Sequence, residues 1–219
     1  MSSCLPSVQA VDGLGYPSAK APFRMATSHR TPRDQVARLE DITVKTLLTE
    51  DELQAGVARI AVEIAAAYGD RPLTIVGVLT GSIVLLADLI RQLDMPLRVG
   101  VLQASSYRRG TTRGELTINA EMMLDVAGRD VLVVDDIFDT GHTLVEVVAK
   151  LKALAPASVK TAVLLRKQGR REVDFSPEFV AFDIPDEFVV GYGLDYADQY
   201  RHLRYLAVLE PDDLTGDRS

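Results

Sequence analysis

The chain has 219 residues, and its 47% hydrophobic content is enough for one α/β domain with a sizeable core and a short extension. Its formal net charge of -7 argues against a surface that binds nucleic acid through its phosphates, so no nucleic-acid partner is expected. The lone Cys4 excludes an intramolecular disulfide and a thiolate metal cluster, and no apolar run approaches membrane-spanning length, so we expect a cytoplasmic protein without membrane contact.

Residues 1–34 carry several glycines and prolines without sustained periodicity, and we predict that they form a flexible extension. No apolar segment follows the start, which argues against a signal peptide. Arginines among serines and threonines are typical of transit peptides, but Asp12 and the missing amphipathic repeat argue against one, and Met25 is an alternative start. Residues 35–219 are predicted to form a single domain.

Regular patterns follow from residue 39 onward. Thr49 and Glu52 form a predicted capping box that begins a helix. Strands are predicted at 73–79, 97–104, 131–134 and 159–165, with helices between them. The inward-facing residues predicted for three helices are Leu53, Val57, Ile60 and Ile64; Ile83, Leu86, Ile90 and Leu93; and Leu144, Val147, Val148, Leu151 and Leu154. Strands that alternate with helices predict an α/β fold with a mainly parallel, doubly wound sheet.

Two polar segments follow predicted strands in the first half of the domain. Thr80-Gly81-Ser82 is a glycine turn between a strand and a helix, and it either binds an anion through its amides or is a plain connection. The stretch 105–115 contains two glycines, three arginines and several hydroxyls, and it is either a mobile cationic flap or an ordinary solvated hairpin.

The most informative run spans residues 131–144. Four apolar residues predict a buried strand, Asp135 and Asp136 follow where that strand is expected to end, and Asp139 lies in a short loop before a helix. In a parallel sheet this turn lies at the carboxyl edge, where open α/β folds bind ligands.

The turn combines two opposite kinds of binding group. Thr140, Gly141, His142 and Thr143 stand where the unpaired N–H groups of a helix start would suit a phosphate. The three aspartates would repel that phosphate unless hydroxyls or a divalent cation stood between them. A phosphorylated ribose with Mg²⁺ satisfies both requirements.

This run resembles the signature of type I phosphoribosyltransferases that binds phosphoribosyl pyrophosphate (PRPP). The resemblance implies a type I phosphoribosyltransferase fold over 35–219, with a central sheet flanked by helices, a small hood and a flexible lid loop. It implies that Asp135 and Asp136 hold the ribose hydroxyls and the water shell of Mg²⁺, and that the loop 139–143 cradles the 5′-phosphate. Asp135 replaces the Glu that is commonest at the first acidic position of the 6-oxopurine enzymes.

Receiver domains of response regulators also place paired aspartates after a strand. They need roughly a full domain of chain beyond that strand, whereas only residues 136–219 follow here, without a further aspartate suitably placed at a strand end. That alternative ranks below the phosphoribosyltransferase.

Further segments resemble the same family in chain order. Thr80 and Gly81 resemble its pyrophosphate loop, in which relatives often carry Lys or Arg where Thr80 stands. Ser106 and Tyr107 resemble the pair that opens the catalytic lid of the hypoxanthine-guanine enzymes. A lid would exclude water from an oxocarbenium-like sugar.

The carboxyl-terminal third resembles the base-binding region of 6-oxopurine phosphoribosyltransferases. Taken alone, Lys167 is a surface lysine and Phe188 a core residue. By the resemblance, Lys167 donates to the purine O6, Phe188 stacks on the base and the Val189 backbone reads the ring edge. Asp195 matches a Mg²⁺ ligand and Arg201 a pyrophosphate contact.

The resemblance implies transfer of the 5-phosphoribosyl group from PRPP to N9 of hypoxanthine or guanine in purine salvage, giving IMP or GMP and pyrophosphate. Asp139 matches the residue proposed to transfer a proton at N7; alternatively it only holds the loop. His142 is interpreted as a donor at the helix start. The alternatives are a nucleotide-sensing, RNA-binding regulator on the same fold and a transferase for another base, xanthine or a pyrimidine. Family habit implies a homodimer or homotetramer.

Overall fold

The structure is a computed structural model that describes residues 45–106, 116–118 and 125–210. The predicted extension 1–34 and the lid residue Tyr107 lie outside the described residues, so both predictions stand as they are.

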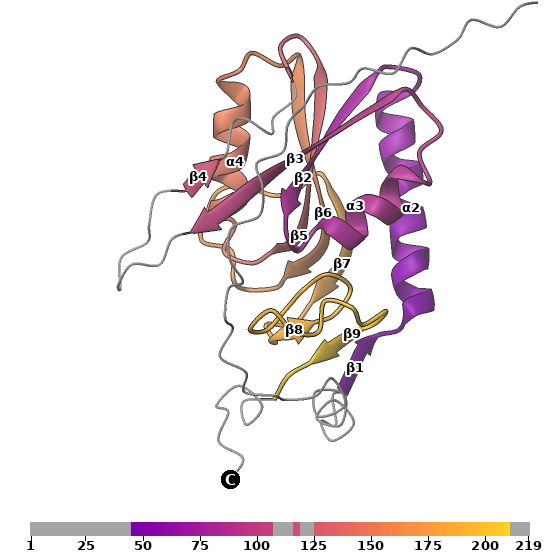
Figure 1. Cartoon of the computed structure of the whole chain (residues 1–219), viewed down its shortest axis with the longest axis vertical. Helices are drawn as coiled ribbons and strands as arrows, with labels where there is room; N and C mark the ends of the chain where they lie inside the picture. The colour runs from indigo at the N-terminus through magenta and orange to yellow at the C-terminus, as the bar shows by residue number, and fades with distance from the viewer. Residues whose placement is uncertain (1–44, 107–115, 119–124, 211–219) are drawn as a thin grey trace, which may run out of the picture. The chain divides into compact units, whose positions relative to one another are not determined.

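A six-stranded sheet forms the centre of the described fold (Figure 1), in the order β4-β3-β2-β5-β6-β7. Its strands are β2 (Leu73–Leu79), β3 (Leu97–Ser106), β4 (Leu116–Ile118), β5 (Asp130–Phe138), β6 (Ser158–Lys167) and β7 (Phe179–Ile184). All neighbours from β3 to β7 pair in parallel, and β4 pairs antiparallel with β3 at one edge. The predicted parallel α/β sheet is confirmed.

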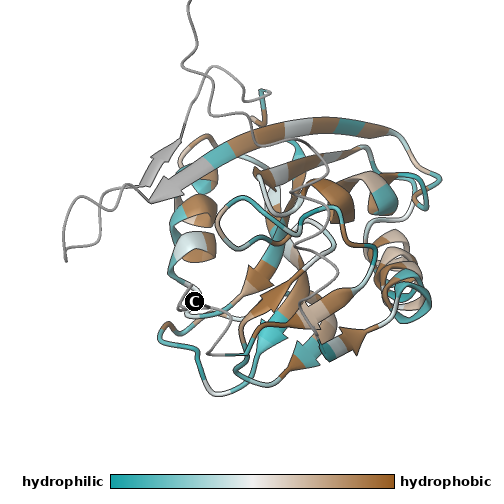
Figure 2. Cartoon of the chain, turned by 60° about the horizontal axis from the view of Figure 1, so that its bottom comes forward, coloured by the Kyte–Doolittle hydropathy of each residue, from teal (hydrophilic) through white to brown (hydrophobic). Residues whose placement is uncertain are grey.

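Helices cover both faces of this sheet (Figure 1). The helices α2 (Glu50–Tyr68) and α3 (Ile83–Ile90) pack into one hydrophobic cluster, whereas α4 (His142–Lys152) packs into another on the opposite face. Figure 2 shows the central strands mainly in the hydrophobic colour and the surface loops mainly in the hydrophilic one. The sheet is therefore doubly wound, with a core on each side.

The start of α2 follows from its sequence. The Thr49 side chain accepts a hydrogen bond from the Glu52 backbone at 3.3 Å, and the Glu52 carboxylate accepts one from the Thr49 backbone at 2.8 Å. The capping box is confirmed. The four predicted inward residues of this helix, Leu53, Val57, Ile60 and Ile64, are fully buried.

The predicted faces of the other two helices are partly wrong. Ile83 is 48% exposed, whereas Leu85 and Leu89 are buried, because almost every residue of α3 is apolar and the pattern does not mark one face. Leu154 is 44% exposed because α4 ends at Lys152, and the other four inward residues predicted for α4 are buried.

β5 is longer than predicted. It continues through the acid pair to Phe138, where it still pairs with β6, and Asp135 lies opposite Val163 in that pairing. The carboxylates of Asp135 and Asp136 are therefore held by sheet backbone rather than by a turn. This extension fixes their positions more firmly than a loop would.

A second, three-stranded antiparallel sheet has the order β1-β9-β8. Its strands are β1 (Lys45–Leu48), β9 (Leu206–Val208) and β8 (Val189–Val190). Figure 1 shows it beyond the carboxyl ends of the parallel strands, in the place expected for the hood. No helix in the described part of the chain is long and apolar enough to cross a membrane.

Candidate active site

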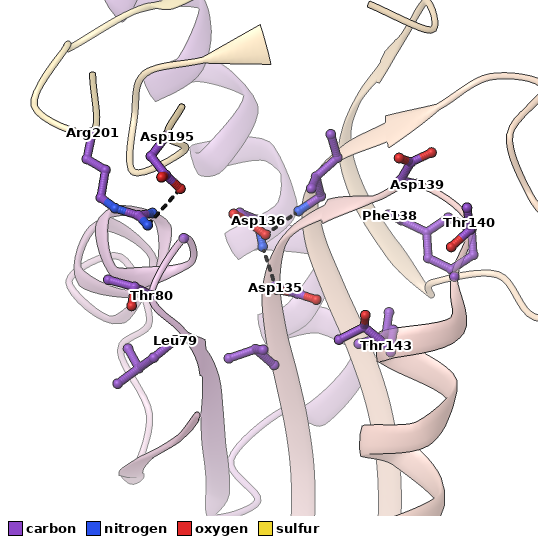
Figure 3. Close-up of a pocket in the computed structure, with 15 residues that line it drawn as sticks. Leu79, Thr80, Asp135, Asp136, Phe138, Asp139, Thr140, Thr143, Asp195 and Arg201 are labelled. Carbon is purple, nitrogen blue, oxygen red and sulfur yellow. Dashed lines mark hydrogen bonds and ion pairs between the residues drawn. The ribbon is translucent and has the colours of Figure 1, made fainter. Parts of the chain in front are cut away.

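A cavity of about 380 Å³ opens at the carboxyl edge of the parallel sheet (Figure 3). Its walls come from the β2–α3 turn, from the end of β5 with the loop into α4, and from the segment between β8 and β9 of the hood, which supplies Asp195 and Arg201. The lining residues are Val78, Leu79, Thr80, Gly81, Asp135, Asp136, Ile137, Phe138, Asp139, Thr140, Gly141, Thr143, Leu144, Asp195 and Arg201. The structure thus brings together every residue predicted to bind PRPP except His142.

The acid pair is the electrostatic centre of this cavity. Asp135 is only 6% exposed, and its carboxylate accepts a hydrogen bond from the Asp136 backbone at 3.0 Å. Asp136 accepts one from the Ile137 backbone at 2.8 Å. Burial raises the pKa of both carboxyls, and the neighbouring Asp136 charge raises the pKa of Asp135 further. Hydroxyl or cation ligands would relieve this unfavourable burial, as expected of a binding site.

The β2–α3 turn lies directly against the acid pair. A Cβ atom added to Gly81 would stand 1.6 Å from Asp136 Oδ2, and one added to Gly193 would stand 2.3 Å from the Gly81 carbonyl oxygen. The peptide bond between Leu79 and Thr80 is cis. Only glycine allows the turn, the acid pair and the hood segment to approach this closely.

The loop before α4 has the form of a phosphate site. Gly141 is the N-cap residue with φ of 89°, and it supplies no side-chain cap. The N–H groups of a first helical turn have no partner within the helix, so they remain available to an anion. His142 does not line the cavity, because its Nε2 pairs with the Glu172 carboxylate at 2.9 Å. Only its backbone can act as the predicted helix-start donor.

The hood contributes an ion pair to the far wall (Figure 3). Arg201 lies 2.7 Å from Asp195 and also donates to the Gly193 carbonyl at 2.7 Å. In the part of the chain that the structure describes, no three metal-ligating side chains converge. The acids predicted to bind Mg²⁺, Asp135, Asp136 and Asp195, therefore face one cavity without forming a preassembled cage.

The residues predicted to bind the base lie outside the cavity lining. Lys167 ends β6, with its Nζ 3.3 Å from Asp186 Oδ1 and 3.9 Å from Asp139 Oδ2. Phe188 is 41% exposed and meets the Tyr196 ring edge-on at 5.5 Å. Val189 is buried in β8. Of these three residues, Lys167 lies near the cavity, because its Nζ approaches Asp139, which lines it.

Sequence reasoning missed Arg170, whose Nε donates to Asp139 Oδ1 at 3.0 Å. The run of cations after Lys167 was the only signal for it, and a charged loop is usually solvated.

Ser106 ends β3, but its side chain is outside the described part, so the lid remains a prediction.

The comparisons agree with this geometry. Residues 43–197 match the family described as phosphoribosyl transferase domain. The chain is 44% identical over 167 residues to the hypoxanthine phosphoribosyltransferase of Salmonella typhimurium, covering 75% of this chain and 94% of that protein. It is 40% identical over 168 residues to the hypoxanthine-guanine phosphoribosyltransferase of Bacillus subtilis, covering 76% and 93%.

A solved structure of a hypoxanthine-guanine phosphoribosyltransferase from Bacillus anthracis matches with a TM-score of 0.72 at 37% identity, covering 76% of this chain and 98% of that one. The chain therefore belongs to the phosphoribosyltransferase family, among its hypoxanthine-guanine phosphoribosyltransferases.

Proposed function

We propose that this enzyme transfers the 5-phosphoribosyl group of PRPP to N9 of hypoxanthine or guanine, releasing pyrophosphate and IMP or GMP. The observation that carries the choice of base is the pair formed by Asp139 Oδ2 and Lys167 Nζ, which lie 3.9 Å apart. This separation exceeds a hydrogen bond, so both groups remain able to bind a ligand.

This pair is an acceptor beside a donor. A 6-oxopurine carries N7 and O6 on one edge, so N7–H would donate to Asp139 while O6 accepts from Lys167. Adenine has an amino group at position 6, and two donors would then face each other. The exposed Phe188 ring would stack on the base, and the Val189 backbone would read its far edge.

PRPP would occupy the cavity at the sheet edge. The Asp135 and Asp136 carboxylates would accept from the ribose hydroxyls, and the loop 139–143 would bind the 5′-phosphate through its amides and hydroxyls. The Thr80 and Gly81 backbone and Arg201 would hold the pyrophosphate.

The donor set fits Mg²⁺ as well. Magnesium is usually bound by one or two carboxylates with waters and substrate phosphates, so facing acids without a cage are suitable. Asp195 would hold it on the pyrophosphate side, and Asp135 and Asp136 on the ribose side. Bound there, it would neutralise the leaving pyrophosphate.

In the reaction, N9 forms a bond to C1 of the ribose as the bond from C1 to pyrophosphate breaks. Asp139 accepts the N7 proton as the base becomes bonded at N9, so no positive charge remains on the purine. The lid that begins at Ser106 and Tyr107 would keep water from the sugar.

A pyrophosphate-release assay with PRPP and Mg²⁺ tests the proposal. Release is expected with hypoxanthine, guanine or both, and not with adenine, uracil or orotate. Release with xanthine or a pyrimidine alone would favour the transferase for another base. Salt-sensitive RNA binding without turnover would instead favour the regulator.

The proposal includes a homodimer or homotetramer in the cytoplasm. Light scattering on the purified protein checks the subunit number. Fractionation of cells that produce the protein checks its location.

A further inference from the structure

Four charged side chains lie together at the end of the cavity where Asp139, the first residue of the β5–α4 loop, faces Lys167. We call Asp139, Lys167, Arg170 and Asp186 the base-end ring. Arg170 Nε lies 3.0 Å from Asp139 Oδ1 and 3.6 Å from Asp186 Oδ1, and Lys167 Nζ lies 3.3 Å from Asp186 Oδ1. Lys167 Nζ also lies 3.9 Å from Asp139 Oδ2, so each cation of the ring lies within ion-pair distance of both carboxylates.

Arg170 distinguishes the two oxygens of Asp139. It donates to Oδ1, whereas Oδ2 faces Lys167 at 3.9 Å. The terminal torsion of an aspartate is broad, so an unrestrained carboxylate at the surface would rotate freely. Asp139 is 36% exposed, and Arg170 makes the shorter of its two ion pairs among the described residues, at 3.0 Å against 3.9 Å for Lys167.

Asp186 allows the two cations of the ring to lie side by side. Its carboxylate oxygen contacts both Lys167 and Arg170, which would otherwise repel each other across the site. Lys167 Nζ lies nearer to Asp186 Oδ1, at 3.3 Å, than to Asp139 Oδ2, at 3.9 Å.

The segment that carries Arg170 is itself fixed to the phosphate loop. The Glu172 backbone donates to the Thr140 carbonyl at 3.1 Å, and a Cβ atom on Gly141 would stand 2.5 Å from the Val173 side chain. Glu172 and Val173, which follow Arg170 in the chain, therefore hold the Arg170 backbone close to the loop that carries Asp139.

We propose that Arg170 is a positioning residue for proton transfer, because it holds Oδ1 of Asp139 so that Oδ2 faces the purine N7. This inference rests on the proposed function. Arg170 acts through Asp139 and does not itself touch the reacting atoms. Without it, Asp139 remains present but rotates among orientations of which few meet N7–H.

The test compares Arg170→Ala, Arg170→Lys and wild type in the full chain, with hypoxanthine as substrate. We expect Arg170→Ala to lower kcat about tenfold while the KM for PRPP stays within about twofold, because the PRPP cavity is unchanged. Arg170→Lys, which keeps a donor, recovers part of the loss. Arg204→Ala is the control, since that side chain is 80% exposed and pairs only with Glu50 among the described residues, at 3.5 Å.

Inhibition by 7-deazahypoxanthine separates positioning from a collapsed base pocket. This base has a C–H group at position 7, so Asp139 cannot accept from it, and its Ki against hypoxanthine should stay within about twofold of wild type in Arg170→Ala. A Ki that rises as far as kcat falls would show a structural role and overturn the inference. An unchanged kcat would also overturn it.

An Asp139→Asn background supplies the second measurement. If Arg170 acts through Asp139, adding Arg170→Ala to Asp139→Asn lowers kcat by less than about twofold. A further tenfold loss would contradict the inference. Turnover of the wild type itself tests the proposed function, and only the ratios between variants test Arg170.

Discussion

The two halves of the candidate site are built in different ways. On the PRPP side, strand ends and glycine contacts hold the acid pair in the wall of one cavity. On the base side, Lys167 and Asp139 belong to a ring of partly exposed ion pairs, and Phe188 stands 41% exposed. Sheet backbone therefore fixes the first half, whereas side-chain charges arrange the second.

This difference predicts how the halves respond to change. Exposed ion pairs contribute little to stability, about 0–1 kcal/mol each, because water screens them and both side chains lose freedom. On the PRPP side, Gly81 packs against the Asp136 carboxylate and Gly193 against the Gly81 carbonyl, so an added side chain displaces the acid pair or the turn itself. Substitutions that displace the turn or the acid pair should therefore weaken PRPP binding strongly, whereas those on the base side should change the rate of transfer and the choice of base.

The largest effect is expected for Gly81→Ala. The new Cβ atom would collide with Asp136 Oδ2 at 1.6 Å, so the turn or the acid pair must move. We expect kcat/KM for PRPP to fall about 100-fold or more, since small misplacements of binding groups cost that much. Gly128→Ala is the control: nothing lies within 4 Å of its added Cβ and it is outside the cavity lining, so it carries only the backbone strain of a φ of 66°. Equal kcat/KM values for the two variants would contradict the claim that the packed Gly81 turn fixes the PRPP side.

The next effect is expected for Asp139→Asn. The amide cannot accept the N7 proton, so kcat should fall about 10²-fold or more while the KM for PRPP changes little. Steady-state kinetics with saturating PRPP measure this. Near-normal turnover would show that Asp139 only holds the loop.

A smaller effect is expected for Lys167→Gln. Loss of the charged donor should lower kcat/KM for hypoxanthine about tenfold. The ratio of kcat/KM for hypoxanthine to that for adenine should also fall, because the glutamine amide oxygen can accept from the 6-amino group of adenine. Parallel assays with the two bases give the ratio. Lys150→Gln, which changes a lysine paired with Glu146 on α4, is the control. An unchanged ratio would place the source of base preference elsewhere.

The smallest effect is on stability and has the opposite sign to that on binding. Burial and the Asp136 charge raise the pKa of Asp135 in the folded state above its unfolded value. The folded state therefore binds a proton more tightly, and the ionised carboxylate destabilises the ligand-free fold at pH values above the raised pKa. This cost disappears as the pH falls through the raised pKa toward the ordinary range.

Asp135→Asn removes that cost. At neutral pH we expect the ligand-free variant to melt about 2–4 °C higher than wild type, while PRPP binding weakens. The difference in Tm should shrink as the pH is lowered, which calorimetry across pH can follow. Asp94→Asn, at an exposed position, is the control. A lower Tm for Asp135→Asn than for wild type at neutral pH would show that the ionised Asp135 carboxylate does not destabilise the ligand-free fold.

The same division governs what could be predicted from the sequence. The acid pair, the Gly81 turn and the Thr49 capping box were predictable, because buried strands and helix starts have local patterns. The extension of β5 to Phe138 was missed, since pairing with β6 overrides the local preference of aspartates. Arg170 was missed because its role depends on a loop fold that no local pattern encodes.

The most direct test of the two-part site is a calorimetric titration of the free protein. With Mg²⁺ present, we predict that PRPP binds without a base, because sheet backbone holds the acid pair that receives it. Hypoxanthine alone should bind at least about 100-fold more weakly than in the presence of a PRPP analogue that cannot react, since partly exposed side chains rather than sheet backbone arrange the groups that bind it. Equally tight binding of hypoxanthine with and without the analogue would contradict the account.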